Sequence, residues 1–125
     1  MTPFGEAVRR LRARKGVSQK EMAMALQVSP AYLSALEHGK RGLPSFEFLQ
    51  RVAGYFNIIW DEADELFAVA RCSDPRVVID TSGLPPEYTA LANKLAAKIR
   101  DLDTTRIAEI DMLLEKQSQD TIKAL

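Results

Sequence analysis

Lys40 and Arg41 stand side by side after a stretch that begins and ends like a short helix, residues 29–38. Ser29 is a good N-cap, the proline after it fits the first helical position, and Gly39 falls where a glycine often ends a helix. Paired cations in a glycine-flanked loop can bind phosphate oxygens, which fix register and supply most of the non-specific affinity for nucleic acid. The spacing predicts a polyanion-binding surface around this helix.

The charges of the chain are unevenly distributed, although they sum to zero. Residues 1–44 hold eight Lys or Arg and three Asp or Glu, residues 45–72 hold two and five, and residues 73–125 hold seven and nine. A positive first third on a neutral chain indicates one end that faces a polyanion. A helix with a solvated basic face is the alternative interpretation.

Catalytic chemistry has little support. Cys72 and His38 are the only residues of their types, so no intramolecular disulfide can form and no metal cluster with Cys/His spacing is visible. The sequence holds no nucleophile–base pair and no glycine loop that could cradle phosphates. We expect no enzyme activity, no metal and no cofactor. Cysteine usage, the lack of a signal-like start and the short apolar runs predict a cytoplasmic protein without a membrane segment.

The elements that must position these residues are helices, which predicts an all-α fold. The apolar spacing and the caps place helices at residues 3–15, 19–26 and 30–38, a fourth after Ser45 and a fifth after Asp61. Thr2 and Ser18 are the expected caps of the first two, and Glu21 completes a capping box with Ser18. The predicted core consists of Phe4, Val8, Leu11, Met22, Ala23, Leu26, Val28, Leu33, Leu36, Leu49, Val52, Ala53, Phe56, Ala63, Leu66, Phe67 and Ala70.

Three segments follow from the change in composition. Residues 1–71 form the five-helix domain, residues 72–85 form a proline-rich linker with a short run that could be extended, and residues 86–125 form a helical extension. Two amphipathic helices, at residues 86–101 and 104–117, cannot bury their apolar faces well alone. We expect them to form a dimer contact with a second subunit, and packing against the fifth helix of the same chain is the alternative.

The helix-turn-helix plan, two short helices with the turn Gln27–Ser29 between them, stands at residues 19–38. The stretch GVSQKEMAMALQVSPAYLSALEHGKRGLPSFEFLQRVAGYF resembles the Cro/repressor-type helix-turn-helix domain, the XRE family of bacterial and phage regulators. The resemblance covers about residues 3–70 and departs from the family pattern at Gln27, where a glycine in a left-handed conformation is usual. The matching residues are Arg12, Gly16, Ser18, Gln19, Glu21, Met22, Ala23, Val28, Ser29, Leu33, Ser34, Leu36, Glu37, Gly39, Lys40, Arg41, Pro44 and Leu49.

The resemblance implies that helix 29–38 enters the major groove of double-stranded DNA. It also implies that Gln19 bonds a phosphate and that Arg12 and Glu37 form a structural ion pair. Tyr32 is either a base reader or a packing residue, and His38 either contacts phosphate or lies on the surface. The expected DNA-binding residues are Gln19, Ser29, Pro30, Ala31, Tyr32, Ser34, Ala35, His38, Lys40 and Arg41.

The sequence therefore predicts a sequence-specific DNA-binding transcriptional regulator that acts as a homodimer. Its binding at a promoter would either block the polymerase, as a repressor does, or recruit it, and repression is the favoured interpretation. We call the helix at residues 29–38 the reading helix. Its front carries no arginine and no amide side chain, so we expect direct base readout to be modest. The alternative function is an antitoxin-like or other protein-binding module whose C-terminal helices hold a small partner protein.

Overall fold

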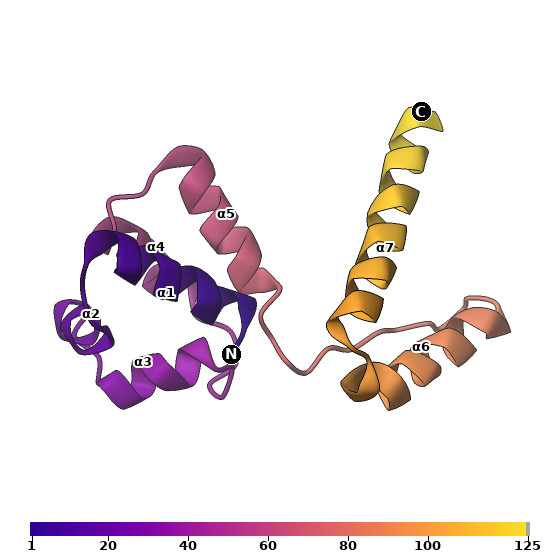
Figure 1. Ribbon diagram of the computed structural model, residues 1–125, viewed down its shortest axis with the longest axis horizontal. Helices are drawn as coiled ribbons and strands as arrows, with labels where there is room; N and C mark the ends of the chain where they lie inside the picture. The colour runs from indigo at the N-terminus through magenta and orange to yellow at the C-terminus, as the bar shows by residue number, and fades with distance from the viewer. Residues whose placement is uncertain (125) are drawn as a thin grey trace. The chain divides into compact units, whose positions relative to one another are not determined.

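The computed structural model describes residues 1–124, and side chains up to residue 120, and it divides into two compact units (Figure 1). Every regular element in this described part is helical, which confirms the predicted all-α fold. The first unit, Met1–Val77, contains α1 (Pro3–Lys15), α2 (Gln19–Ala25), α3 (Pro30–Glu37), α4 (Phe46–Tyr55) and α5 (Trp60–Arg71). The second unit begins at Val78 and contains α6 (Pro86–Lys98), the short 3-10 helix η1 (Ile99–Asp101) and α7 (Thr104–Ala124).

Local side-chain caps start the first four helices where the sequence predicted them. The hydroxyl groups of Thr2, Ser18 and Ser29 each accept a hydrogen bond from the backbone N–H three residues later. Ser45 caps α4 in the same way. These contacts satisfy N–H groups that the helix itself leaves without partners. The expected capping box of α2 is present, since Glu21 also accepts from the backbone N–H of Ser18.

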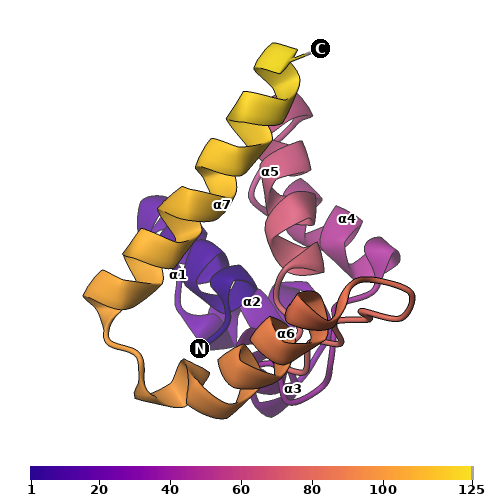
Figure 2. The ribbon, with the colours of Figure 1, turned by 90° about the vertical axis from the view of Figure 1, so that its right-hand side faces the viewer.

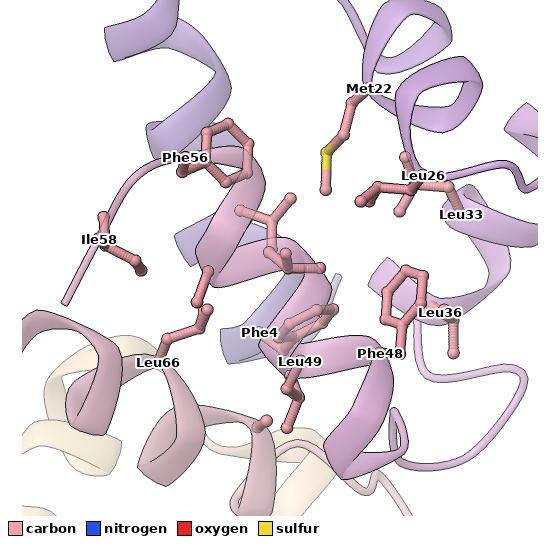
Figure 3. Close-up of a cluster of buried hydrophobic side chains, with 14 of the residues drawn as sticks. Phe4, Met22, Leu26, Leu33, Leu36, Phe48, Leu49, Phe56, Ile58 and Leu66 are labelled. Atoms are coloured by element: carbon pink, nitrogen blue, oxygen red, sulfur yellow. The ribbon is translucent and has the colours of Figure 1, made fainter.

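One apolar core holds the first unit together, and every helix of the unit contributes to it (Figure 3). Helix α1 packs against both α3 and α5, α2 packs against α3, and α4 packs against α5. Phe4, Met22 and Leu33 are fully buried, and Figure 3 shows them among side chains that point toward one another. Four residues predicted for the core are only partly buried, because they lie where the core meets solvent: Leu11, Val28, Ala63 and Phe67.

The first compact unit extends beyond residue 71, where the sequence placed the end of the domain. Ser73 is buried, accepts a hydrogen bond from the backbone N–H of Phe4 (2.9 Å) and donates one to the carbonyl of Val69 (2.7 Å). The start of the predicted linker is thus tied to the first turn of α1. No strand forms at residues 76–80. At the end of this run, hydrogen bonds from Ser82 hold the pKa of the exposed carboxyl group of Asp80 below its usual value.

The second unit has no buried side chain among residues 78–120. Helices α6 and α7 diverge from the turn that joins them, as Figure 1 and Figure 2 both show. The first predicted helix of this unit ends in 3-10 geometry at η1, and the second continues beyond residue 117 to Ala124. Leu91, Met112 and Leu114 are each about two-thirds exposed. Helices with apolar faces of this kind gain stability when another surface covers those faces.

Candidate nucleic-acid interface

Helices α2 and α3 form the predicted helix-turn-helix, and the turn between them is tightly held. The backbone N–H of Val28 donates to the carbonyl of Ala23 (3.0 Å), and a side-chain nitrogen of Arg51 on α4 donates to the carbonyl of Leu26. Gln27 has a φ of 59°, the left-handed conformation for which the family pattern uses glycine. The departure at this position therefore leaves the turn geometry intact, at a cost of about 1–2 kcal/mol for a residue with a Cβ.

The front of α3 is open to solvent over its first turn. Ser29, Pro30, Ala31 and Tyr32 are exposed, and Ser34 and Ala35 are partly buried. The hydroxyl oxygen of Ser29 caps the helix by accepting from the backbone N–H of Tyr32 at 3.0 Å. The opposite side of α3 carries Leu33 and Leu36, both buried in the core. The structure thus brings the expected contact positions of α3 together on one accessible surface.

Tyr32 has neighbours on two sides. Its ring meets the ring of Phe48 on α4 edge to face, with centroids 6.4 Å apart and an interplanar angle of 83°. The guanidinium carbon of Arg41 lies 5.6 Å from the centroid of the Tyr32 ring. The side chain is still 37% exposed. Tyr32 therefore packs against the domain and remains accessible, so the two interpretations of this residue are compatible.

Gln19 makes a side-chain contact that the sequence did not predict. Its Nε2 atom donates a hydrogen bond to Glu37 Oε2 at 2.6 Å, and the side chain is partly buried. A carboxylate oxygen can only accept, so the amide must turn its nitrogen toward Glu37. The amide keeps one N–H free for a further acceptor. No local pattern signals this contact, because 18 residues separate the two partners.

Arg12 and Glu37 lie against each other between α1 and α3, as the resemblance implied. Arg12 Nη1 is 2.8 Å from Glu37 Oε1, and the two side chains are 10% and 0% exposed. The same Nη1 donates to the sulfur of Met22 at 3.6 Å. Charge attraction across a nearly water-free contact therefore holds α3 to α1.

Thr2 and Gly5 hold the start of α1 close to the end of α3, a role that the sequence did not predict for either residue. The backbone carbonyl of Glu37 accepts from the backbone N–H of Thr2 (3.0 Å) and from its hydroxyl group (2.8 Å). A Cβ on Gly5 would lie 2.2 Å from the same carbonyl oxygen. A glycine is therefore required where α1 crosses the last turn of α3. The capping role predicted for Thr2 gave no sign of this second partner, which is 35 residues away.

The cations near α3 differ in how they are engaged. Lys40 and Arg41 are exposed, and neither forms an ion pair within the described part of the chain. The exposed ring of His38 lies with Nδ1 2.8 Å from the carbonyl of Ser34, so Nδ1 carries the proton that is shared with this acceptor. Two other cations are engaged away from α3. Arg14 pairs with Glu62 at 2.6 Å, and Lys15 Nζ lies 3.9 Å from the centroid of the Tyr55 ring.

Other kinds of site have little support in the described residues. No group of three or more His, Cys, Asp or Glu side chains there could hold a metal ion. None of the described helices combines the length and apolar character needed to cross a bilayer. A groove of about 350 Å³ lies between α1 and α5, with Arg10, Arg14, Glu62 and Glu65 among its lining residues.

The chain is similar to known proteins over about half of its length. A family described as a helix-turn-helix domain matches residues 3–66. The HTH-type transcriptional regulator SlrR of Bacillus subtilis (strain 168) is 38% identical over 64 residues, which are 51% of this chain and 40% of that protein. The uncharacterized HTH-type transcriptional regulator RghRB of the same strain is 30% identical over 61 residues, 49% of this chain and 44% of that protein.

A third relative comes from another organism. The HTH-type transcriptional regulator DdrOP3 of Deinococcus deserti (strain DSM 17065 / CIP 109153 / LMG 22923 / VCD115) is 43% identical over 53 residues, 42% of this chain and 40% of that protein. The chain spans less than half the length of these relatives, and no solved structure gives a significant match. The family match runs from the first turn of α1 into α5 and includes the α2–turn–α3 geometry, so the chain belongs to the helix-turn-helix domain family, as its resemblance to Cro/repressor-type (XRE) proteins predicted.

Proposed function

We propose that this protein is a sequence-specific DNA-binding transcriptional regulator that places α3 in the major groove as a homodimer. One observation carries the proposal: the exposed front of α3 lies on the outer helix of a helix-turn-helix and is followed by Lys40 and Arg41, two cations that form no ion pair with any described side chain. A helix presented in this way fits the width of the major groove, and cations at its end are attracted to the polyanion. The names of the three relatives support the same function.

The contact residues divide into two groups. Those at the start and front of α3 face the base edges: Ser29, Pro30, Ala31, Tyr32, Ser34 and Ala35. The methyl groups of Ala31 and Ala35 suit the methyl group of thymine. Gln19, His38 and Lys40 lie beside the DNA backbone, where the free N–H of the Gln19 amide donates to a phosphate oxygen.

The second unit supplies the dimer contact. Residues 78–120 bury no side chain, and Leu91 on α6 and Leu114 on α7 are about two-thirds exposed. A second copy of the chain covers these faces and holds two reading helices on one DNA duplex. Binding two half-sites at once raises the affinity of a module that reads each half-site weakly.

Regulation follows from occupancy of a promoter. A dimer bound over the promoter excludes the polymerase, so the protein acts as a repressor in the cytoplasm. This role needs no cofactor and no catalytic step.

The test is a selection of bound sequences from random duplex DNA by the purified protein at stated salt concentrations. The expected result is an inverted repeat with half-sites about one helical turn apart, roughly 34–36 Å between centres. Salt-sensitive binding without any enriched sequence would contradict the proposal, because phosphate contacts alone carry no sequence information.

A protein-binding function is the second candidate, and the uncovered apolar faces of α6 and α7 favour it. An antitoxin-like module would hold a small partner protein with these helices. Sedimentation of the purified chain separates the two candidates. A homodimer supports the proposed regulator, whereas a monomer that forms a defined complex with one small protein supports the second candidate.

A further inference from the structure

We propose that Arg41 reads a guanine base in the major groove, and that Tyr32 is the platform that places it there. The sequence assigned Arg41 to a phosphate, together with Lys40. The inference builds on the proposed DNA-binding function and adds the residue that supplies specificity and the base that it recognises.

Helix α3 cannot recognise a guanine by itself. The commonest specific contact to guanine is a pair of hydrogen bonds from one arginine or lysine to the O6 and N7 atoms. Helix α3 (Pro30–Glu37) contains neither of these residues, and it contains no asparagine or glutamine for the corresponding contact to adenine. A strong polar reader must therefore come from outside the helix.

The loop after α3 turns back toward the helix and brings Arg41 to its front. Gly39 and Gly42 have φ values of 76° and 73°, the left-handed region in which glycine is free of strain. The backbone N–H of Lys40 donates to the carbonyl of Ala35 at 2.9 Å, which fixes the loop to the last turn of the helix. Arg41 follows this anchored residue directly.

The guanidinium group of Arg41 lies near the ring of Tyr32, with its central carbon 5.6 Å from the ring centroid. A cation within about 6 Å of an aromatic ring centroid is attracted to the face of the ring. Tyr32 is itself supported by the edge-to-face contact with Phe48. Two successive ring contacts therefore connect a flexible arginine side chain to the core of the domain, and they restrict its position before DNA binds.

The ring contact leaves the hydrogen-bonding capacity of Arg41 unused. A guanidinium group has five N–H donors around its edge, whereas a cation–π contact uses its charge and its face. Arg41 is exposed, and within the described residues it makes no hydrogen bond or ion pair that would occupy these donors.

Lys40 is the internal comparison. It is exposed like Arg41, but its ammonium group makes no aromatic contact in the described residues. A mobile ammonium group suits a phosphate, which accepts from many directions. A planar fork held at the front of the reading helix suits the fixed pair of acceptors on guanine.

The experiment compares Arg41→Lys with the matched control Arg14→Lys, using the full chain and circular dichroism to confirm that both variants fold. Affinity is measured by fluorescence anisotropy for the selected operator and for a scrambled duplex, at several salt concentrations. Arg41→Lys keeps the charge but loses the planar fork that the Tyr32 ring holds in place, and a flexible lysine in this loop is not positioned in advance for O6 and N7. We expect its operator affinity to fall roughly 5- to 150-fold, with little change on the scrambled duplex or in the salt dependence. Arg14→Lys changes an arginine that pairs with Glu62 away from α3, and it should leave the preference unchanged.

A modified operator identifies the base. Replacing each guanine in turn by 7-deazaguanine removes the N7 acceptor without changing base pairing. At one position the replacement should weaken binding of the wild-type protein and leave binding of Arg41→Lys unaffected.

Three results would overturn the inference while the proposed function stands. The first is a selected operator in which no guanine is required. The second is an Arg41→Lys variant that prefers the operator as strongly as the wild-type protein does. The third is an Arg41→Ala variant that loses affinity equally for both duplexes, while the slope of its log affinity against log salt concentration falls by about one. The last result would identify Arg41 as a phosphate contact. A wild-type protein that prefers no sequence would instead remove the proposed function, and this inference with it.

Discussion

Glu37 connects three helices through one buried side chain. Its carboxylate pairs with Arg12 on α1 and accepts from Gln19 on α2, while its own residue ends α3. The side chain is fully buried. A charge in such a position is tolerated because Oε1 lies 2.8 Å from the Arg12 guanidinium, an ion pair without hydrogen-bond geometry, and Oε2 accepts a hydrogen bond from Gln19. The orientation of the reading helix and that of the phosphate-facing amide therefore depend on the same group.

Glu37→Gln tests this connection. The variant leaves the guanidinium of Arg12 nearly buried without its counter-charge, so we expect the free energy of unfolding to fall by about 3 kcal/mol. Urea denaturation measures the change. The matched control is Glu62→Gln, which breaks the exposed pair with Arg14 and should cost less than about 1 kcal/mol. Equal losses in the two variants would show that burial adds nothing to the Arg12–Glu37 pair.

Gln27 carries backbone strain in the turn. A glycine has no Cβ to oppose a φ of 59°, so Gln27→Gly should raise the free energy of unfolding by about 0.5–1 kcal/mol. The control is Gln50→Gly on the exposed side of α4, where glycine should lower it by about 1 kcal/mol. The test is the sign of the change in the free energy of unfolding, which should differ between the two variants. Destabilisation at both positions would mean that Gln27 is unstrained.

At the scale of the elements, the decisive contact is the crossing of α1 over the end of α3. Thr2 donates twice to the Glu37 carbonyl, and Gly5 leaves the space that this approach needs. The same carbonyl belongs to the last turn of the reading helix, so the distance between α1 and α3 sets where α3 is presented.

Gly5→Ala should therefore lower both stability and DNA affinity. Its Cβ would lie 2.2 Å from the Glu37 carbonyl oxygen, and backbone at that distance must shift. We expect a loss of at least about 2 kcal/mol in the free energy of unfolding. Gly54→Ala is the matched control, since a Cβ there meets nothing within 4 Å, and it should stabilise α4 by about 0.5–1 kcal/mol. Thermal unfolding and anisotropy on the operator measure the two effects, and an unchanged Gly5→Ala variant would contradict the crossing contact.

At the scale of the whole molecule, the two compact units differ in how they bury apolar side chains. The first unit has a continuous core, whereas residues 78–120 bury none. A 48-residue unit whose described side chains form no core gains little from folding alone, so its helices are stabilised when another chain covers them. This difference is the physical basis of the proposed dimer.

Leu114→Glu tests the dimer. Leu114 shares one face of α7 with Ile107 and Ile110 by helical spacing, and a carboxylate on that face should separate the subunits. Sedimentation equilibrium should then give a monomer, and the affinity for an operator with two half-sites should fall at least tenfold. Met112→Glu is the control, because Met112 is equally exposed but lies on the opposite side of the helix. Identical behaviour of the two variants would place the subunit contact elsewhere.

The sequence by itself determined the helices, their caps and the helix-turn-helix plan, because these depend on contacts within a few residues. Ser29 and Gly16 act on neighbours three or four positions away, so their effect can be predicted from the local pattern. The same holds for the apolar spacing that placed Phe4 and Leu33 in the core.

Only the tertiary structure decided which polar groups meet. Gln19 finds Glu37 across 18 residues, Thr2 finds the Glu37 carbonyl across 35, and Arg41 reaches Tyr32 only because two left-handed glycines turn the loop back. Each of these contacts depends on how whole helices cross, and the crossing is set by the packing of many core side chains at once. For that reason the residues around the reading helix could be named from the sequence, while their partners could not, apart from the Arg12–Glu37 pair that the family resemblance implied.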